Sequence, residues 1–400
     1  MSTAPLAGRA RALSRASRLQ RAIHALRTEG DSRGRESVAI GLGLLIGCSP
    51  FWGVHFGLCW LAGALFRLNR LKMYLAANVI NPLVIPPLLY AEVQAGSWLR
   101  RGHLVALTWD MVEPEAIWSF GADLVLGSVV IGVGVGALGA IVTYAARRPA
   151  RDPFFQLLVR RASDRYLDTG ITAWEFARGK LSGDPVYAAA LTTELPAATG
   201  TLLDIGCGQG LMLALVAEAQ HTAAQGEWDT TRPDPPQLSR LIGVETRPRI
   251  ASIAARALEH EATIVSADAR ETGLPACDVA LLFDVLHMMP DADQRALLGT
   301  VHAALAPGGR LMVREADAGA GWRFVMVRIG NACKAFVAGR WRQRFTFRTA
   351  AAWRTVLHET GFTPHVQPMG EGTPFANVLI VASRRADDAA ASHDRPAPSS

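Results

Sequence analysis

Three long segments without a charged residue, all within the first 150 positions, restrict the fold most. They cover residues 37–66, 73–91 and 124–146. A helix needs about 20 apolar residues to cross the hydrocarbon core of a bilayer, and each segment is near or above that length. A buried helical domain is the alternative, but protein alone would have to cover all three segments. The pattern therefore predicts an α-helical membrane domain over residues 37–146.

The three segments differ in how well they suit a simple span. The first is interrupted by Gly-Cys-Ser-Pro at residues 47–50, so a re-entrant hairpin and a broken helix both fit. The second contains three prolines, which argue against an ideal helix. The third is the clearest span. Its Gly132 and Gly136 form a small face that favours close helix packing, although small residues also occur there by chance.

A basic segment precedes the first uncharged run. Residues 1–36 contain eight arginines, and no acidic residue occurs before Glu29. A transit peptide has this composition, but a positive cytoplasmic flank is also what a following membrane segment requires. We expect residues 1–36 to be a basic cytoplasmic tail held near anionic lipid.

Two phrases in this half carry a resemblance. IGLGLLIGCSPFWGVHFGLCWLAGALF and NVINPLVIPPLLY resemble a bacterial family of small integral-membrane domains without an established function, over most of residues 35–146. The resemblance implies a multi-pass protein of the bacterial cytoplasmic membrane whose C-terminal domain lies in the cytoplasm. It names no substrate.

The second half has the pattern of a soluble α/β domain over residues 152–385. Apolar runs of strand length alternate with helical stretches, which predicts a parallel sheet. Strands are expected at 201–205, 241–244, 263–266, 279–283, 310–314 and 378–382. Helices are expected over 154–181 and after Asp184-Pro185, with an inserted polar loop over 221–239. The polar tail 386–400 is expected to be disordered.

A glycine-rich turn follows the first expected strand in the phrase LLDIGCGQG, residues 202–210. Glycines there let a ligand approach the backbone, but dinucleotide-binding loops use a similar spacing. Asp204 distinguishes the two cases, because a carboxylate suits a cationic or amino-bearing ligand and gains nothing beside a pyrophosphate.

Acidic residues end the later strands: Glu245 follows LIGV, Asp268 follows TIVSA and Asp284 follows VALLF. Together they outline a nucleoside pocket, although each could be a solvated strand-end residue. With GVE, ADA, FDVLHMMP and LAPGGRLMVRE in this order, residues 199–384 resemble the class I S-adenosylmethionine-dependent methyltransferases. The resemblance implies a Rossmann-like, mostly parallel seven-stranded sheet with S-adenosylmethionine as cofactor.

The matched positions imply a cofactor-binding set. Glu245 would accept hydrogen bonds from both ribose hydroxyls, Asp268 would meet the adenine amino group, and Asp204 would organise the amino-acid end. Glu245 follows the last glycine of the turn by 35 residues, more than the roughly 20 expected, and the inserted loop accounts for the excess. The set comprises Asp204, Gly206, Cys207, Gly208, Gly210, Glu245, Asp268, Ala269, Asp284 and Leu286.

Two further features concern the acceptor. Methyl transfer depends mainly on orientation, so a base is optional. His287 is the candidate base for a hydroxyl acceptor, and a residue of the pocket wall is the alternative. The basic and aromatic residues 321–345 suit either a membrane interface that receives an amphiphilic substrate or a helix packed on the sheet with a solvated arginine face. Nucleic acid is a weaker option.

These patterns predict a membrane-anchored methyltransferase that acts on a small, lipophilic or membrane-associated acceptor, with membrane lipid as a partner. The alternative is a membrane transport or scaffold protein whose C-terminal domain senses S-adenosylmethionine without catalysis. A nicotinamide-dependent oxidoreductase is disfavoured by Asp204. The five scattered cysteines form no CxxC pair, which predicts reduced thiols and no metal site.

Overall fold

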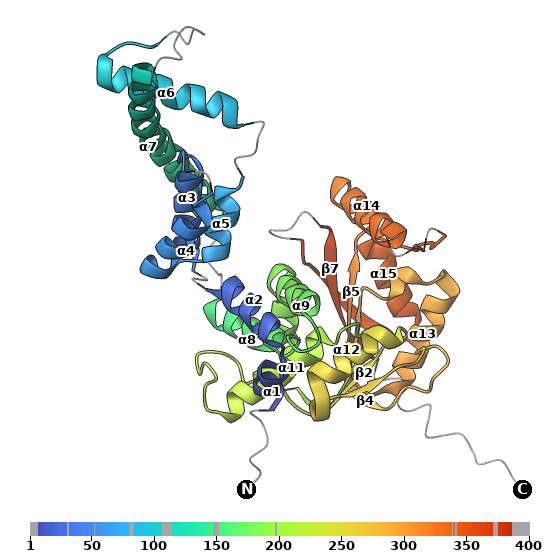
Figure 1. Cartoon of the computed structure of the whole chain (residues 1–400). Helices are drawn as coiled ribbons and strands as arrows, with labels where there is room; N and C mark the ends of the chain where they lie inside the picture. Colours follow the sequence, from blue (N-terminus) through green and yellow to red (C-terminus); the bar gives the residue numbers. More distant parts are fainter. Residues whose placement is uncertain are drawn as a thin grey trace, which may run out of the picture. The chain divides into compact units, whose positions relative to one another are not determined.

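The computed structural model describes residues 7–29, 32–51, 53–79, 84–105, 114–146, 152–196, 198–337, 339–340, 342–370 and 375–385. The chain divides into two compact units (Figure 1). One unit is formed by Arg18–Arg151, and the other by Met1–Ser17 together with Asp152–Ser400.

The first unit is helical. Its helices are α2 (Arg18–Thr28), α3 (Arg33–Gly47), α4 (His55–Phe66), α5 (Arg70–Ala77), α6 (Ile85–Arg101) and α7 (Pro114–Ala146). The uncharged segment 37–66 therefore contains two helices, and 73–91 is divided between α5 and α6. Among the residues that the structure describes, one helical stretch is long and apolar enough to cross a membrane, from Gly121 to Ala145 in α7.

Glycines bring the helices of this unit into close contact. A Cβ on Gly136 would lie 2.6 Å from the carbonyl oxygen of Gly41 in α3, and a Cβ on Gly132 would lie 3.3 Å from that of Leu45. A Cβ on Gly127 would lie 1.7 Å from the carbonyl oxygen of Glu92 in α6. Gly136 thus lets α3 and α7 pack closely, since a side chain there would clash with the backbone of Gly41, whereas the contact at Gly132 is tight but needs only a small shift.

The predicted basic tail is divided between the two units. Helix α1 (Ala7–Arg15) packs in the second unit against α8 (Pro153–Asp164). Arg9 Nε lies 3.0 Å from Asp164 Oδ2, and Arg15 forms an ion pair with Glu259. These arginines are therefore engaged by carboxylates of the second unit, which the charge pattern alone did not predict.

A seven-stranded sheet in the order β3-β2-β1-β4-β5-β7-β6 organises the second unit. The five strands from β3 to β5 pair in parallel, whereas β7 is antiparallel to both β5 and β6. This confirms the mostly parallel Rossmann-like sheet and corrects the expectation that the last strand is parallel. The strands are β1 (Thr199–Ile205), β2 (Gln237–Val244), β3 (Thr263–Val265), β4 (Cys277–Phe283), β5 (Leu305–Ala316), β6 (Phe362–Pro368) and β7 (Asn377–Arg384).

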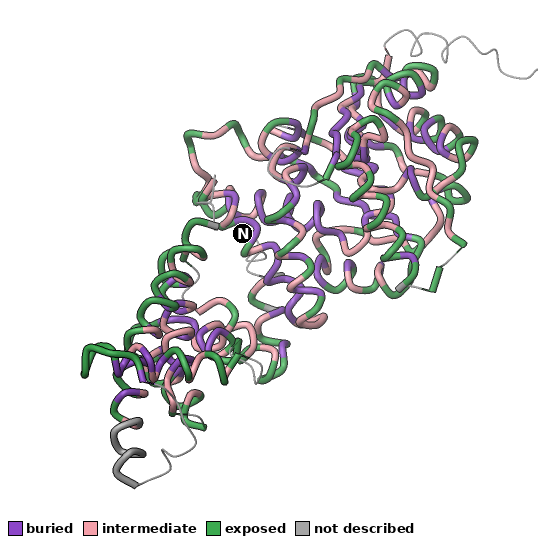
Figure 2. The backbone as a smooth tube through the Cα atoms, turned by 90° about the horizontal axis from the view of Figure 1, so that it is seen from above, coloured by how far each residue is buried: buried purple, intermediate pink, exposed green. Residues whose placement is uncertain are grey.

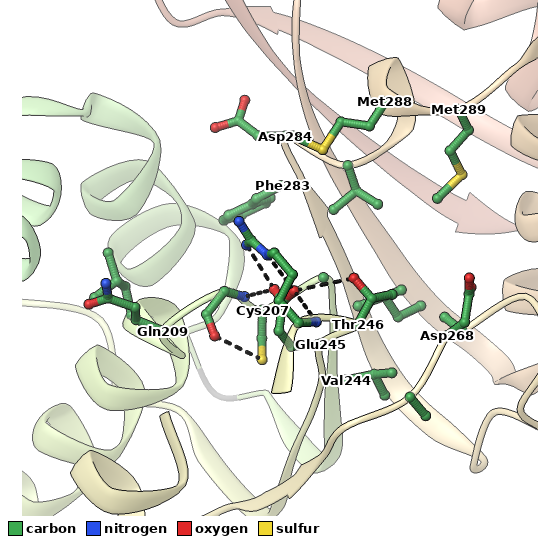
Figure 3. Close-up of a pocket in the computed structure, with 18 of the residues that line it drawn as sticks. Cys207, Gln209, Val244, Glu245, Thr246, Asp268, Phe283, Asp284, Met288 and Met289 are labelled. Atoms are coloured by element: carbon green, nitrogen blue, oxygen red, sulfur yellow. Dashed lines mark hydrogen bonds and ion pairs between the residues drawn. The ribbon is translucent and has the colours of Figure 1, made fainter. Parts of the chain in front are cut away.

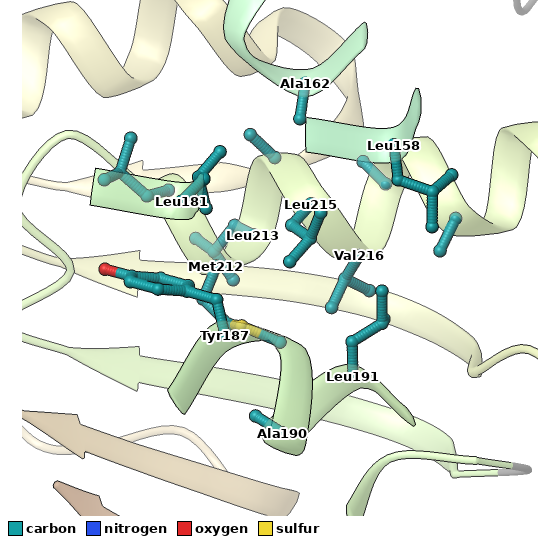
Figure 4. Packing of buried hydrophobic residues seen from close by; sticks show 14 of the residues in the cluster. Leu158, Ala162, Leu181, Tyr187, Ala190, Leu191, Met212, Leu213, Leu215 and Val216 are labelled. Atoms are coloured by element: carbon teal, nitrogen blue, oxygen red, sulfur yellow. The ribbon is translucent and has the colours of Figure 1, made fainter. Parts of the chain in front are cut away.

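Helices cover both faces of the sheet, and buried positions run through the middle of the unit (Figure 2). On one face α8 and α11 (Leu211–Ala224) contribute a leucine-rich layer, with Leu158, Leu213 and Leu215 close together (Figure 4). The helices are α9 (Ile171–Gly183), α10 (Pro185–Ala189), α11 (Leu211–Ala224), α12 (Pro248–Leu258), α13 (Asp291–Ala304), α14 (Trp322–Val337) and α15 (Ala350–Glu359).

Three local expectations need correction. The helix predicted over 154–181 is interrupted, because Gly170 has φ = 140° and separates α8 from α9. The inserted loop is shorter than 221–239, since α11 continues to Ala224 and β2 begins at Gln237. Strand β6 was not predicted; it lies at the sheet edge and contains two prolines, which are tolerated there. The tail 386–400 lies outside the described residues.

Candidate functional site

A cavity of about 490 Å³ opens at the carboxyl ends of the parallel strands (Figure 3). The loops after β1, β2, β3 and β4 all contribute to its wall. The strand order reverses at β1, which pairs with β2 on one side and β4 on the other. Open α/β sheets bind their ligands at such a reversal, because the connecting helices diverge there.

The glycine-rich turn forms one side of this cavity. Gly206 and Gly208 have φ of 71° and 58°, in the left-handed region that favours glycine. A Cβ on Gly206 would also lie 2.5 Å from Val285 Cγ2. Both glycines and Cys207 line the cavity. Gly210 does not; it precedes α11 and is packed toward Leu258.

Glu245 is buried at the end of β2 and lines the cavity. Its Oε2 accepts a hydrogen bond of 2.9 Å from the backbone N–H of Gly208, and its Oε1 accepts bonds of 3.0 and 2.8 Å from Arg247 N and Nε. Burial alone would raise the pKa of Glu245, but these hydrogen bonds outweigh burial and hold the pKa below its ordinary value. The residue is therefore a fixed carboxylate that ties the glycine turn to β2.

Arg247 competes with any ligand hydroxyl for Glu245, because its half-exposed guanidinium occupies the carboxylate. We expect Arg247→Ala to tighten binding of S-adenosylmethionine by up to about fivefold, since the solvent-exposed arginine limits the contribution of the pair to about 0–1 kcal/mol. Calorimetric titration measures this change. Weaker binding by the variant would instead show that Arg247 contacts the ligand.

Asp268 and Ala269 follow β3 and line the cavity. Hydrogen bonds from Arg270 lower the pKa of Asp268, the side-chain bonds more than the backbone bond. Asp268 is thus ionised at the position where the resemblance places the adenine amino group.

Asp284 follows β4 with φ = 61°, a left-handed conformation that non-glycine residues rarely adopt. Its N–H donates to the carbonyl oxygen of Arg314 over 2.9 Å, and its carboxylate pairs with Arg314 and with Lys180 Nζ at 3.4 Å. Asp184 joins the same cluster, with Oδ2 lying 2.8 Å from Lys180 Nζ and 2.7 Å from Arg314 Nη2. Two cations and two carboxylates thus fix the loop after β4.

Asp204 and Leu286 do not contribute to the cavity wall. Leu286 is fully buried in the hydrophobic core beneath the loop after β4. Asp204 is buried in β1, where burial, reinforced by the nearby Glu245, raises the pKa of its carboxyl group to about 7. Both side chains would therefore influence a cofactor indirectly in this conformation.

The raised pKa makes Asp204 a source of pH-dependent stability. Between about pH 4 and 7 the folded state retains a proton that the unfolded state releases, so stability falls as the pH rises through this window. Asp204→Asn should therefore leave thermal unfolding of this unit unchanged near pH 4 and raise its midpoint by about 5 °C at pH 8. Calorimetric scans at both pH values test this, and equal midpoints at pH 8 would contradict it.

A second cavity of about 440 Å³ shares four wall residues with the first: Lys180, Asp284, Met288 and Lys334. Its wall also includes side chains from β5 and α14. Because the two cavities meet at the end of β4, a ligand in one would lie beside a ligand in the other. This arrangement suits group transfer between two bound molecules.

His287 lines the second cavity and is buried. Its Nδ1 lies 2.7 Å from Glu315 Oε2, and its backbone N–H donates to Glu315 Oε1 at 3.2 Å. The ring stacks on Phe347 with centroids 5.0 Å apart. A carboxylate at Nδ1 favours the tautomer that carries its proton there, which leaves Nε2 free to accept one. Within the described residues Nε2 has no hydrogen-bond partner.

The structure thus adds residues that the sequence did not assign. Glu315 and Arg314 end the phrase LAPGGRLMVRE, which forms β5 beside β4. The pairing of these two strands was the one feature from which their position near His287 and Asp284 could have been predicted. Lys180 and Asp184 come from the segment before β1. Lys180 pairs with Asp284 across 104 residues and Asp184 with Arg314 across 130, and no local sequence pattern indicates either contact.

Comparison with known proteins divides the chain in the same way. Residues 174–367 match the model of a family described as a methyltransferase domain. Residues 16–152 match a family described as an uncharacterized protein conserved in bacteria (DUF2062).

Similar curated proteins include demethylspheroidene O-methyltransferase of Rhodobacter capsulatus, 28% identical over 186 residues, which are 46% of this chain and 41% of the relative. Carboxy-S-adenosyl-L-methionine synthase of Psychrobacter arcticus is 27% identical over 119 residues, which are 28% of this chain and 40% of that relative. The chain thus spans about two fifths of the length of these relatives. A solved structure, N-methyltransferase NodS of Bradyrhizobium japonicum with S-adenosyl-L-homocysteine, is 17% identical with a TM-score of 0.37, covering 58% of this chain and 99% of that one.

The cavity at the strand ends and the matched regions agree: residues 174–367 match a methyltransferase domain, and residues 16–152, which precede it, match the DUF2062 family.

Proposed function

We propose that this protein is a membrane-associated methyltransferase that transfers a methyl group from S-adenosylmethionine to a hydroxyl group of a small, lipophilic acceptor. The observation that carries the proposal is the His287–Glu315 pair in a cavity that adjoins the cofactor cavity. A nitrogen acceptor would need no such base if it arrived as a free amine, whereas a hydroxyl must lose its proton during transfer.

The first cavity fits S-adenosylmethionine better than a dinucleotide. The N–H of Gly208, which a pyrophosphate would need, is occupied by the carboxylate of Glu245. Glu245 and Asp268 both offer acceptors to the hydroxyl and amino groups of a nucleoside. We infer that Glu245 holds the ribose and that Asp268 and Ala269 contact the adenine. Gly206, Cys207 and Gly208 then leave room for the remaining part of the cofactor. Gly210, Asp204 and Leu286 would support these positions from behind the wall.

When bound, S-adenosylmethionine supplies an electrophilic methyl group on a sulfonium. The protein's part is to orient the acceptor oxygen and to remove its proton. His287 Nε2 would take that proton, and Glu315 would stabilise the resulting imidazolium through Nδ1. The ion cluster around Asp284 would hold the boundary between the cavities in place, so that the acceptor approaches in line.

The membrane part of the proposal rests on the first unit. In the apolar part of α7, only 22% of a stretch of 18 residues is buried. The shorter apolar helix α4 also exposes large side chains. Surfaces of this kind are unfavourable in water and suit lipid. We therefore propose that the DUF2062 domain resides in the bacterial cytoplasmic membrane, which would keep the enzyme and a lipophilic acceptor in one plane.

One assay tests this function. The full chain in lipid nanodiscs is incubated with S-adenosylmethionine carrying a labelled methyl group and with paired acceptors, a lipophilic phenol or hydroxyquinone and its amine analogue. The proposal predicts label transfer to the hydroxyl compounds. Cofactor binding without transfer to any acceptor would favour a non-catalytic sensor, and transfer to amines alone would contradict the assigned role of His287.

A further inference from the structure

Helix α14 has an exposed apolar stripe, of which Val325 and Ile329 also border a hollow shared with Phe345. Trp322, Val325, Ile329 and Phe336 follow one another at intervals of three, four and seven residues. Met326 lies next to Val325, and all five are exposed, with Trp322 at 65% and Phe336 at 62%. At 3.6 residues per turn these side chains occupy one side of the helix. An exposed stripe of large apolar side chains marks a surface that binds another apolar surface.

The opposite side of the same helix forms part of the acceptor cavity. Val327, Asn331 and Lys334 line that cavity, together with His287 from the loop after β4. One helix therefore separates the acceptor cavity from the exposed stripe. Whatever contacts the stripe lies one helix diameter, about 10 Å, from the acceptor.

The positive charge around α14 indicates which kind of apolar surface the stripe binds. From residue 318 to 358 the chain has eight lysine and arginine residues and no acidic residue. Three of them, Arg323, Arg328 and Lys334, lie on α14 itself and are exposed, and Lys334 also lines the acceptor cavity. A second copy of the chain would oppose like charges across this stripe, which is unfavourable. An anionic bilayer offers both an apolar layer for the stripe and negative headgroups for the arginines.

We propose that α14 is an interfacial helix that docks on an anionic bilayer, and that the acceptor reaches the cavity from the lipid beneath it. Trp322, Ile329 and Phe336 enter the boundary between headgroups and acyl chains, while Arg323 and Arg328 contact the headgroups. The docking does not depend on the proposed reaction, whereas the route of the acceptor rests on that function.

Cys333 provides a probe for the test, because it is exposed on α14 whereas the other four cysteines are buried. The full chain is labelled at Cys333 with a polarity-sensitive fluorophore. It is then reconstituted in nanodiscs of phosphatidylcholine with or without about 40% phosphatidylglycerol. Lipids that carry a nitroxide quencher report contact with the bilayer. We expect a blue shift and at least about threefold stronger quenching in the anionic nanodiscs.

Two variants separate the contributions of the stripe and the charges. Val325→Asp combined with Ile329→Asp should abolish quenching, and Arg323→Gln combined with Arg328→Gln should remove its dependence on anionic lipid. The matched control is Thr355→Asp on an exposed position of α15, which should behave as the unmodified chain does. Quenching that survives the double aspartate variant would overturn the proposal.

The other possible partners give different results. A blue shift without quenching that grows with protein concentration would indicate a second copy, and a shift caused by an oligonucleotide but not by lipid would indicate nucleic acid. Either would overturn the bilayer assignment. S-adenosylmethionine binding, measured by calorimetry, should be equal in the double aspartate variant and the unmodified chain. Absence of binding in both would reject the proposed function and leave the docking result standing.

Discussion

Replacing His287 with alanine is expected to lower kcat for methyl transfer to a hydroxyl acceptor by about 10²- to 10⁴-fold, the usual contribution of a positioned base. Affinity for S-adenosylmethionine should not change, because His287 lines the acceptor cavity and not the cofactor cavity. Assays with labelled cofactor, stopped at fixed times, measure kcat. Calorimetric titration of the same protein measures the affinity for S-adenosylmethionine.

Glu315→Gln is the companion variant. It keeps the shape of the side chain but removes the charge that opposes His287 Nδ1 over 2.7 Å. We expect a smaller loss, about 10- to 100-fold in kcat, since the imidazole remains but its protonated form is less stabilised. Full activity of His287→Ala would show that the histidine is part of the cavity wall, the alternative that its sequence position left open.

Removing the carboxylate of Glu245 should have the largest effect on cofactor binding. Glu245→Ala is expected to weaken S-adenosylmethionine binding by at least about 100-fold, because hydrogen bonds to a charged group contribute about 1.5–3 kcal/mol each. The change also frees the Gly208 N–H and Arg247, which Glu245 holds in the structure. Titration calorimetry provides the measurement.

Asp268→Asn is the matched control for this site. Asp268 is more exposed than Glu245, and its carboxylate is shared with Arg270, so its loss should weaken binding by about tenfold or less. Equal losses for the two variants would contradict the ribose assignment of Glu245. Unchanged affinity in Glu245→Ala would reject it outright.

The sequence was most informative where one element determines the position of a residue. Glu245, Asp268 and Asp284 each follow a buried strand, so the parallel order of the sheet brings them to one edge, where the structure shows them around one cavity. The glycine-rich turn could also be predicted from neighbouring residues alone. Its left-handed φ at Gly206 and Gly208 follows directly from residue type.

Other features depend on contacts between distant segments and were not predicted. Glu315 reaches His287 because β5 lies beside β4, and Lys180 reaches Asp284 across 104 residues. Leu286 lies in the hydrophobic core and not on the cavity wall, because alternation along a strand does not continue through the turn that follows it. Strand β6 lacked the apolar pattern of a central strand, since it pairs on one side only.

The identity of the ligand in the first cavity is the central claim, and one calorimetric experiment tests it most directly. S-adenosylmethionine and NAD are titrated separately into the full chain in nanodiscs and into Glu245→Ala. The account predicts micromolar binding of S-adenosylmethionine that the substitution weakens, and no comparable binding of NAD. Preference for NAD, or no binding of S-adenosylmethionine by the unmodified chain, would contradict it.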